Sequence, residues 1–360
     1  MERLTRLSLF FLCVATGCGD GSVTISPRQR AVNGGNQDPS RLAVDETTPA
    51  SPRGATRSFQ FHYKVDISGL EPRKTVRVWL PVPTSSVDQE VTPLAHQLPA
   101  EPSFHTEPKY DNRILYIETA VPESGELHLD VPYQVQRHEI LALKQDDHGK
   151  NHVLSEGQRK LFLQANTKVP IDGRPLELLS GLTLSDDTCE LAKQLYELVD
   201  QHVTYKKVGT GWGNGDVLWV CKSRYGNCTD FHSLFISLAR SQGIPSRFEI
   251  GFPVPGDAEQ GAIGGYHCWV FFFTQNRGWV PVDISEADKY PFMKKYYFGN
   301  LTPDRITFST GRDIELVPRC ENGPLNYFIY PHVEVDGAPL PRNQIALNFS
   351  YVDSPSNTTD

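Results

Sequence analysis

Residues 224–247, RYGNCTDFHSLFISLARSQGIPSR, decide the fold of this chain. Their apolar side chains recur at helical spacing, which predicts an amphipathic helix with one buried face: Phe231, Leu234, Phe235 and Leu238. Gly243 and Pro245 end the helix, because glycine favours the C-terminal cap and proline cannot continue it. Asn227 or Thr229 is expected to cap its start.

Cys228 stands at the beginning of this predicted helix. The unpaired N–H groups and the positive end of the helix dipole favour an anion there, which stabilises a thiolate and lowers the pKa of the thiol. We therefore interpret Cys228 as a candidate nucleophile. The alternative is a buried structural cysteine, the commoner fate of a free thiol.

The composition is that of a globular protein long enough to form a sizeable core. The chain has 360 residues, 39% of them hydrophobic, and a net charge of −8 without a basic run, which speaks against a nucleic-acid partner. Seven cysteines are present. If an N-terminal signal segment is cleaved, Cys13 is lost with it and Cys18 carries lipid. Five cysteines then remain, an odd number, so at least one thiol is free or paired between molecules.

Residues 1–18 have the layout of a secretory signal: Arg3 and Arg6, a short apolar run, then small residues before Cys18. The end of this segment resembles a bacterial lipobox, in which the cysteine is lipidated and becomes the new N-terminus. Cleavage with full secretion is the alternative. We expect a cell-envelope lipoprotein or else a periplasmic or secreted protein, with membrane contact only through that lipid, and a disordered polar tether over 19–56.

The segment 57–140 alternates apolar and polar residues in several short runs separated by Gly and Pro. This pattern predicts a β-sandwich-like module. Residues 141–182 are interpreted as a connector with a short helix near 156–166. A further helix is predicted from Ser185 to about His202.

A hairpin is predicted from the strand that begins near Tyr266, the turn Thr274–Gly278 and the returning residues 279–283. With the turn centred near Gln275, His267 and Asp283 lie opposite one another on one face of the pair. A register slip by one residue would place them diagonally, still within reach.

A Cys at a helix start, followed by a His and an Asp on a hairpin, supplies the groups for nucleophilic acyl chemistry. The thiolate attacks a carbonyl carbon, the imidazole carries the proton, and the carboxylate orients the imidazole. Singly, His267 could pack among aromatics and Asp283 could cap a turn. Jointly, the three favour the catalytic interpretation.

The stretches GNCTDFHSLFISLARSQGIPSR, GYHCWV and GWVPVDISEADKYP resemble the transglutaminase-like superfamily of papain-type fold. The resemblance implies Cys228 as nucleophile, His267 as base and Asp283 as orienting acid. It also implies an α+β core, with the nucleophile helix packed on an antiparallel sheet, over 183–345. The segment 57–140 is similar, more loosely, to the sandwich domain that precedes this core in bacterial members.

The family also places an oxyanion donor upstream of the cysteine, for which Trp212, Trp219 and Asn227 are candidates. Cys268 introduces a second thiol beside His267. A metal site from Cys228, His232, His267 and Cys268 is an alternative, disfavoured because structural sites show tighter paired ligand spacing. We therefore expect no metal and no cofactor.

The expected substrate is a protein or peptide, attacked at a peptide or glutamine-type amide through a thioester. Hydrolysis is slightly favoured over amine transfer because water, at about 55 M, needs no second pocket. The competing hypothesis is a non-catalytic module that binds protein or cell-wall peptide. Residues 290–360 are expected to complete the sheet or flank the cleft, with 346–360 as a disordered tail.

Overall fold

Strand β1 (Thr56–Ile67) alternates apolar and polar residues, as the sequence predicts. Its inward side chains are almost fully buried: Phe59, Phe61, Tyr63, Val65 and Ile67. The structure is a computed structural model that describes residues 55–143 and 151–355. The predicted signal segment, the lipidation site Cys18 and almost all of the tether lie outside these residues.

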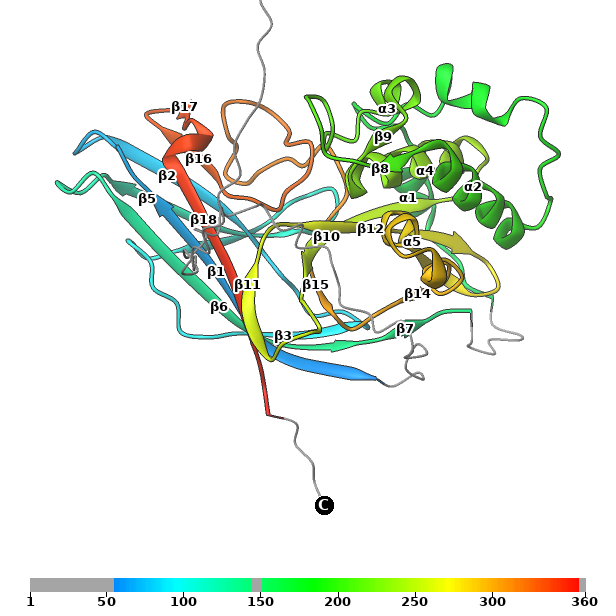
Figure 1. The fold of residues 1–360 in the computed structure, drawn as a ribbon. Helices are drawn as coiled ribbons and strands as arrows, with labels where there is room; N and C mark the ends of the chain where they lie inside the picture. Colours follow the sequence, from blue (N-terminus) through cyan, green and yellow to red (C-terminus); the bar gives the residue numbers. More distant parts are fainter. Residues whose placement is uncertain (1–54, 144–150, 356–360) are drawn as a thin grey trace, which may run out of the picture. The chain divides into compact units, whose positions relative to one another are not determined.

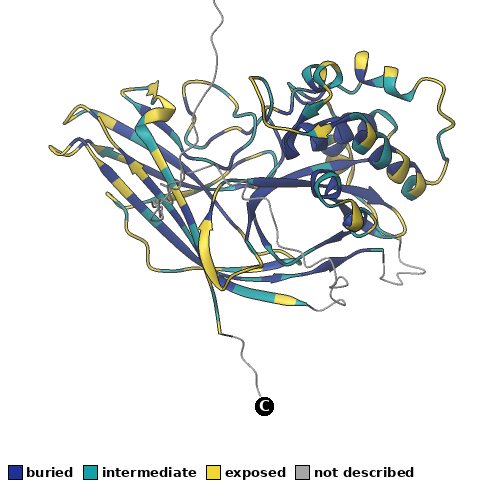
Figure 2. Ribbon diagram, viewed as in Figure 1, coloured by how far each residue is buried: buried dark blue, intermediate teal, exposed yellow. Residues whose placement is uncertain are grey.

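Two five-stranded antiparallel sheets contribute to one hydrophobic core (Figures 1 and 2). The first has the order β11-β18-β1-β6-β3. Strand β1 pairs with β6 (Leu127–His138) and β18 (Ile345–Asp353), β3 (Gln89–Pro93) pairs with β6, and β11 (Gln260–Ile263) pairs with β18. The second has the order β17-β16-β2-β5-β4, with β2 (Thr75–Val82), β4 (Ser103–Thr106), β5 (Arg113–Ala120), β16 (His332–Val335) and β17 (Ala338–Pro339).

The prediction of a disordered tail over 346–360 is wrong for residues 346–353. Strand β18 pairs along β1 from Ile67↔Ile345 to Phe59↔Asp353 and also pairs with β11. Phe349 and Tyr351 are buried on its inner face. The strand forms because apolar residues alternate along it at period two: Ile345, Leu347, Phe349 and Tyr351.

Strands from both sides of the predicted domain boundaries share these sheets, since β11, β16 and β18 lie beyond residue 182. The domain boundaries themselves stay a prediction. All described residues fall within one compact unit.

A four-stranded antiparallel sheet, β13-β12-β10-β15, carries the candidate catalytic region. Its strands are β10 (Ser246–Pro253), β12 (His267–Thr274), β13 (Gly278–Val282) and β15 (Arg305–Thr310). Helix α4 (Cys228–Ser241) packs on β12 and β10, and both β12 and α4 are buried along nearly their whole length (Figure 2). A helix packed on an antiparallel sheet is the α+β arrangement that the sequence predicts.

Four further helices surround α4 or its sheet: α1 (Glu156–Leu163), α2 (Thr188–His202), α3 (Val217–Ser223) and α5 (Ile284–Lys289). Helix α2 begins three residues later than predicted, because Asp187 accepts from the N–H groups of Cys189 and Glu190 as its N-cap. The remaining elements are short: β7 (Ile140–Leu141) with β14 (Asn300–Leu301), β8 (Thr204–Tyr205) with β9 (Tyr225–Gly226), and 3₁₀ turns at Arg174–Leu179, Pro291–Met293 and Arg342–Gln344.

Within residues 55–143 and 151–355, no helix is long and apolar enough to span a membrane.

Candidate active site

Cys228 is the first residue of α4, as the sequence predicts. Asn227 is the N-cap: its side chain accepts from the Thr229 N–H at 2.9 Å and from that of Asp230, whose carboxylate accepts in return from the Asn227 N–H. This reciprocal capping box satisfies the first donors of the helix. The thiol of Cys228 is thereby held at the positive end of α4.

The carboxylate of Asp230 also binds the glycine-rich loop that precedes the helix. It accepts from the Gly213 N–H at 2.6 Å and the Gly215 N–H at 2.9 Å. Burial raises its pKa to about 6, although these backbone hydrogen bonds oppose the rise. The loop and the start of α4 therefore form one hydrogen-bonded unit around Cys228.

His267 begins β12, and Asp283 follows β13 as the N-cap of α5. The imidazole Nε2 lies 2.7 Å from Oδ2 of Asp283, while Oδ1 accepts from the Glu286 N–H at 3.2 Å. The capping role that the sequence offered as an alternative for Asp283 thus coexists with the contact to His267. One oxygen orients the ring and the other holds the helix.

The hairpin register differs by one residue from the predicted centre at Gln275. Thr274 pairs with Gly278 and Val270 with Val282, so the centre is Asn276 and Asp283 lies diagonal to His267. Gly278 has φ of +70°, which supplies the left-handed residue that a three-residue hairpin turn requires. The diagonal offset still leaves the two side chains in hydrogen-bond contact.

The charges of these groups depend on one another. Burial would raise the pKa of Asp283, but the charge of His267 and the hydrogen bond to its ring hold this pKa far below the usual range. Burial alone would lower the pKa of His267; Asp283 and Cys228 raise it to about 9. Burial would raise the pKa of Cys228, yet hydrogen bonding to Cys268 and to His267, with the charge of His267, lowers it well below its usual value.

The lowered pKa of Cys228 and the raised pKa of His267 together favour a thiolate paired with a charged imidazole. Because Nε2 of His267 faces the carboxylate, Nδ1 is the nitrogen left for Cys228. Nδ1 has no hydrogen-bond partner among the described residues. The exposed fractions are 2% for Cys228, 2% for His267 and 0% for Asp283, so the pair is shielded from water and its Coulomb attraction is strong.

His232 supports this arrangement as a neutral ring. Its Nε2 accepts from the Ile284 N–H at 3.1 Å and its Nδ1 lies 3.4 Å from the Cys268 sulfur. Burial lowers the pKa of His232 to about 4, against the charges of Asp283 and Cys228. The Nε2 lone pair is occupied by this hydrogen bond. In the alternative metal site, His232 therefore loses one of its two ring nitrogens as a possible ligand atom.

The three oxyanion candidates are placed differently. The amide of Asn227 donates one hydrogen to the Tyr266 hydroxyl at 2.9 Å, so that hydrogen is already engaged beside the nucleophile. The indole N–H of Trp212 donates to the Gly209 carbonyl at 3.2 Å, and Trp219 packs against Tyr225, with ring centroids 5.3 Å apart. These contacts do not bring either tryptophan to Cys228, and their role stays a prediction.

Sequence reasoning missed two residues at this site. Arg305, on β15, donates to Oδ2 of Asp283 at 3.1 Å and lies 4.8 Å from the ring centroid of Trp269. Tyr266 places its hydroxyl 2.9 Å from the Thr229 hydroxyl. Arg305 carries no motif signal, whereas the position of Tyr266 directly before His267 could have suggested it.

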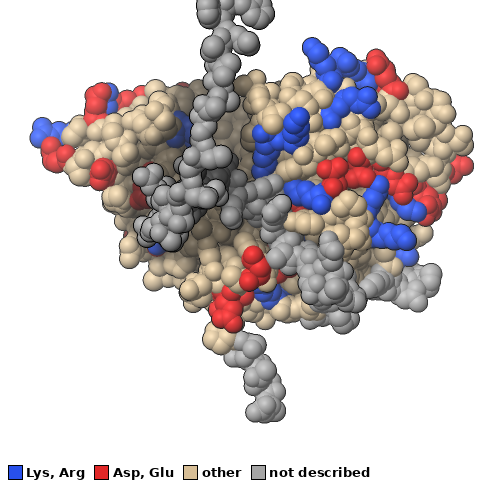
Figure 3. Space-filling model, viewed as in Figure 1, with Lys and Arg blue, Asp and Glu red and all other residues tan. Residues whose placement is uncertain are grey.

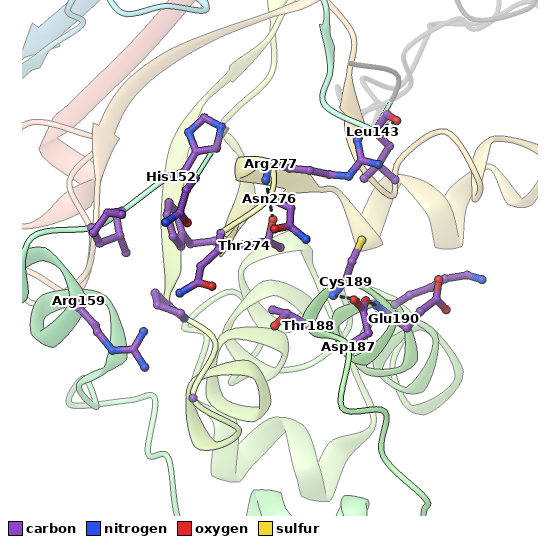
Figure 4. Close-up of a pocket in the computed structure, with 18 of the residues that line it drawn as sticks. Leu143, His152, Arg159, Asp187, Thr188, Cys189, Glu190, Thr274, Asn276 and Arg277 are labelled. Atoms are coloured by element: carbon purple, nitrogen blue, oxygen red, sulfur yellow. Dashed lines mark hydrogen bonds between the residues drawn. The ribbon is translucent and has the colours of Figure 1, made fainter. Parts of the chain in front are cut away.

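A cavity of about 1460 Å³ lies near the other end of α4 (Figure 4). It is lined by residues of the α2 start, the segment after α4 and the hairpin turn, including Asp187, Cys189, Gly243 and Arg277. None of Cys228, His267 and Asp283 lines it. On the face shown in Figure 3, acidic and basic side chains are intermixed over much of the helical region.

Part of the chain matches a known family. Residues 179–284 match the transglutaminase-like superfamily. An uncharacterized protein of Haemophilus influenzae is 34% identical over 162 residues, which cover 36% of this chain and 44% of that protein. The chain thus aligns with less than half of the length of this curated relative.

Among solved structures, a candidate cysteine protease from Cytophaga hutchinsonii superposes with a TM-score of 0.52 at 14% identity, covering 84% of this chain and 99% of that one. The periplasmic domain of TgpA from Pseudomonas aeruginosa gives 0.34 at 15% identity, over 71% and 93% of the two chains. The first likeness confirms the predicted α+β fold. Residues 179–284, the part of the chain that matches the transglutaminase-like superfamily, contain Cys228, His267 and Asp283.

Proposed function

We propose that the protein is a cysteine-dependent enzyme that cleaves or transfers acyl groups at peptide or glutamine-type amide bonds. Cys228 is the nucleophile, His267 the acid and base, and Asp283 the group that orients His267. The observation that carries the proposal is the 2.7 Å contact between His267 Nε2 and Asp283 Oδ2, beside a thiol of lowered pKa at the start of α4. A structural cysteine requires neither feature.

In the first step, the Cys228 thiolate attacks the amide carbonyl carbon, and the electron pair moves to the oxygen. The capping box of α4 uses the N–H groups of Thr229 and Asp230, which leaves that of Cys228 to donate to the oxyanion. When the C–N bond breaks, the imidazolium of His267 gives its proton to the departing amine. The acyl group then remains on sulfur as a thioester.

In the second step, the neutral imidazole takes a proton from water or from an amine as that molecule attacks the thioester carbon. Collapse expels the thiolate, and His267 is again charged. Water gives hydrolysis and an amine gives transfer. We propose hydrolysis as the main reaction, because it requires no second binding pocket.

The low exposure of Cys228 bears on how this reaction begins. With 2% of its surface accessible, the side chain cannot meet a carbonyl carbon unless neighbouring groups move. The Tyr266 hydroxyl is bonded to side chains on both sides of Cys228, Asn227 and Thr229. We propose that displacement of this tyrosine accompanies substrate binding.

The test uses the full chain and Cys228→Ala, incubated with glutamine-containing and general peptide libraries and an isotope-labelled amine. Mass spectrometry distinguishes hydrolysed from amine-labelled products. We expect products only with the wild type and with Cys221→Ser, the matched control for loss of a thiol on α3. Absence of both products, together with a Cys228 thiol that is alkylated only above pH 8, would instead support a non-catalytic binding module.

We further propose that the protein is exported and anchored through lipid on Cys18, with protein or peptide as its partner. The support is the layout of residues 1–18. Labelling with an alkyne fatty acid in a bacterial host should mark the wild type and leave Cys18→Ala unmarked. Labelling of both proteins would contradict the anchor.

A further inference from the structure

We propose that Cys320, His332 and Glu334 form a binding site for a divalent transition-metal ion of the zinc class, separate from the proposed catalytic residues. The sulfur of Cys320, a ring nitrogen of His332 and a carboxylate oxygen of Glu334 all lie within 4.8 Å of one another. Thiolate, imidazole and carboxylate together are a donor set that suits Zn²⁺.

The strand β16 fixes two of the donors. His332 and Glu334 are two residues apart and therefore project on the same side of the strand. They pair with Trp79 and Arg77 of β2, and the Trp79 ring lies 5.4 Å from that of His332. Packing against the indole restricts the imidazole before any ion binds.

The third donor comes from the segment between β15 and β16, which is held close to the strand. Trp79 donates to the Pro318 carbonyl at 2.8 Å, and the Glu321 N–H donates to Oε1 of Glu334 at 2.8 Å. These bonds flank Cys320 on both sides. The thiol itself donates to the Gly323 carbonyl at 3.3 Å, and the cysteine is free of disulfides.

The spacing needs only a small contraction to hold an ion. With Zn–S near 2.3 Å and Zn–N or Zn–O near 2.0 Å, the ligand atoms of a tetrahedral site lie about 3.3 to 3.6 Å apart. His332 Nε2 and Glu334 Oε1 are 3.1 Å apart, and the cluster spans at most 4.8 Å. Side-chain movements that shorten these separations by up to about 1.5 Å therefore suffice.

The local charge also suits a divalent cation. Arg77 pairs with Oε2 of Glu334, which leaves Oε1 directed at His332, and also lies 3.5 Å from Glu321. On binding, Zn²⁺ replaces the proton of Cys320, which is released to solvent. The two positive charges of the ion and that of Arg77 then match the three negative charges of Cys320, Glu321 and Glu334.

The ion pair with Arg77 explains why Glu334 is buried, but it does not explain a free thiol and an imidazole at the same point. Cys320 is 3% exposed, and it also lines a cavity of about 410 Å³ together with Gly323, Pro324 and Glu315. This cavity gives an ion access and leaves room for water as a fourth ligand. Three protein ligands with one open position are a usual zinc arrangement.

The test is a Co²⁺ and Zn²⁺ titration of the full chain, without a histidine tag and in the Cys228→Ala background, which removes the reactive thiolate as a competing ligand. Co²⁺ should produce visible d–d bands with a sulfur-to-metal band in the near ultraviolet, in a ratio of one ion per chain. Zn²⁺ should abolish these bands by displacement.

The added substitution Cys320→Ser should remove the sulfur band, and His332→Ala should weaken Zn²⁺ affinity about tenfold or more, as expected when a ligand is lost. Cys189→Ser is the matched control and should change neither. The proposal is overturned if no band forms, or if the sulfur band survives Cys320→Ser. Thermal melting of each apo protein checks folding, and Cys320→Ser preserves the size of the side chain.

Discussion

Replacement of Asp283 by Asn should uncouple the thiolate–imidazolium pair. The carboxylate is the largest influence that raises the pKa of His267, to about 9 from an ordinary value of about 6.5. One pKa unit corresponds to about 1.4 kcal/mol, so the net shift, after burial has opposed it, favours the charged ring by about 3 kcal/mol. Burial works in the opposite direction and remains after the substitution.

In Asp283→Asn, we therefore expect the pKa of His267 to fall below 7 and that of Cys228 to rise, because each charge stabilises the other. The asparagine amide can also donate to Nε2, which would favour the wrong ring tautomer. Activity should fall by about two to four orders of magnitude. The protein should otherwise keep the α5 cap, since the amide oxygen can accept from the Glu286 N–H.

The assay is the rate of iodoacetamide alkylation of Cys228 as a function of pH, with thiolate absorbance near 240 nm as a second readout. The wild-type profile should have its thiolate step well below pH 8, and that of Asp283→Asn should be displaced upward by about one pH unit or more. Asp288→Asn is the matched control on the same helix, where the side chain accepts from the Tyr205 N–H. Identical profiles for wild type and Asp283→Asn would refute the reasoning.

Three other perturbations test the buried network and the corrected C-terminus. The pKa of His232 is depressed to about 4 in the folded state, so the buried neutral ring contributes to stability above about pH 6.5, and this contribution is lost as the pH falls towards about 4. In His232→Gln, urea denaturation should therefore show less acid destabilisation than in the wild type. Arg305→Met leaves Asp283 without its guanidinium partner and should reduce the free energy of unfolding by about 3 to 5 kcal/mol, and an unchanged urea midpoint would contradict this. Truncation after Gln344 removes β18 from between β1 and β11 and should abolish cooperative unfolding, whereas truncation after Pro355 should leave the melting temperature unchanged.

The nucleophile helix could be predicted from the sequence because its signals are local. Phe231, Leu234 and Phe235 mark the buried face, and Gly243 with Pro245 marks the end. The hairpin was predictable for the same reason, except for a register that depends on the conformation of one glycine.

Arg305 could not be predicted, because its contact with Asp283 depends on β15 pairing with β10 and not on any spacing in the chain. The same holds for β18, whose partner β1 lies almost 300 residues earlier. The Cys320 cluster likewise joins a loop and a strand that only the pairing of β16 with β2 brings into place. Local periodicity fixes elements, whereas non-local pairing decides which side chains meet.

The central claim is that Cys228 carries the acyl group. Intact-mass spectrometry of the protein, quenched in acid within milliseconds to seconds of mixing with an activated acyl ester or a reactive glutamine peptide, measures this directly. The account predicts a mass increase equal to one acyl group, mapped to Cys228, released by hydroxylamine and absent from Cys228→Ala. An acyl group that maps to Cys268 or to another residue, or an equal adduct on Cys228→Ala, would contradict it.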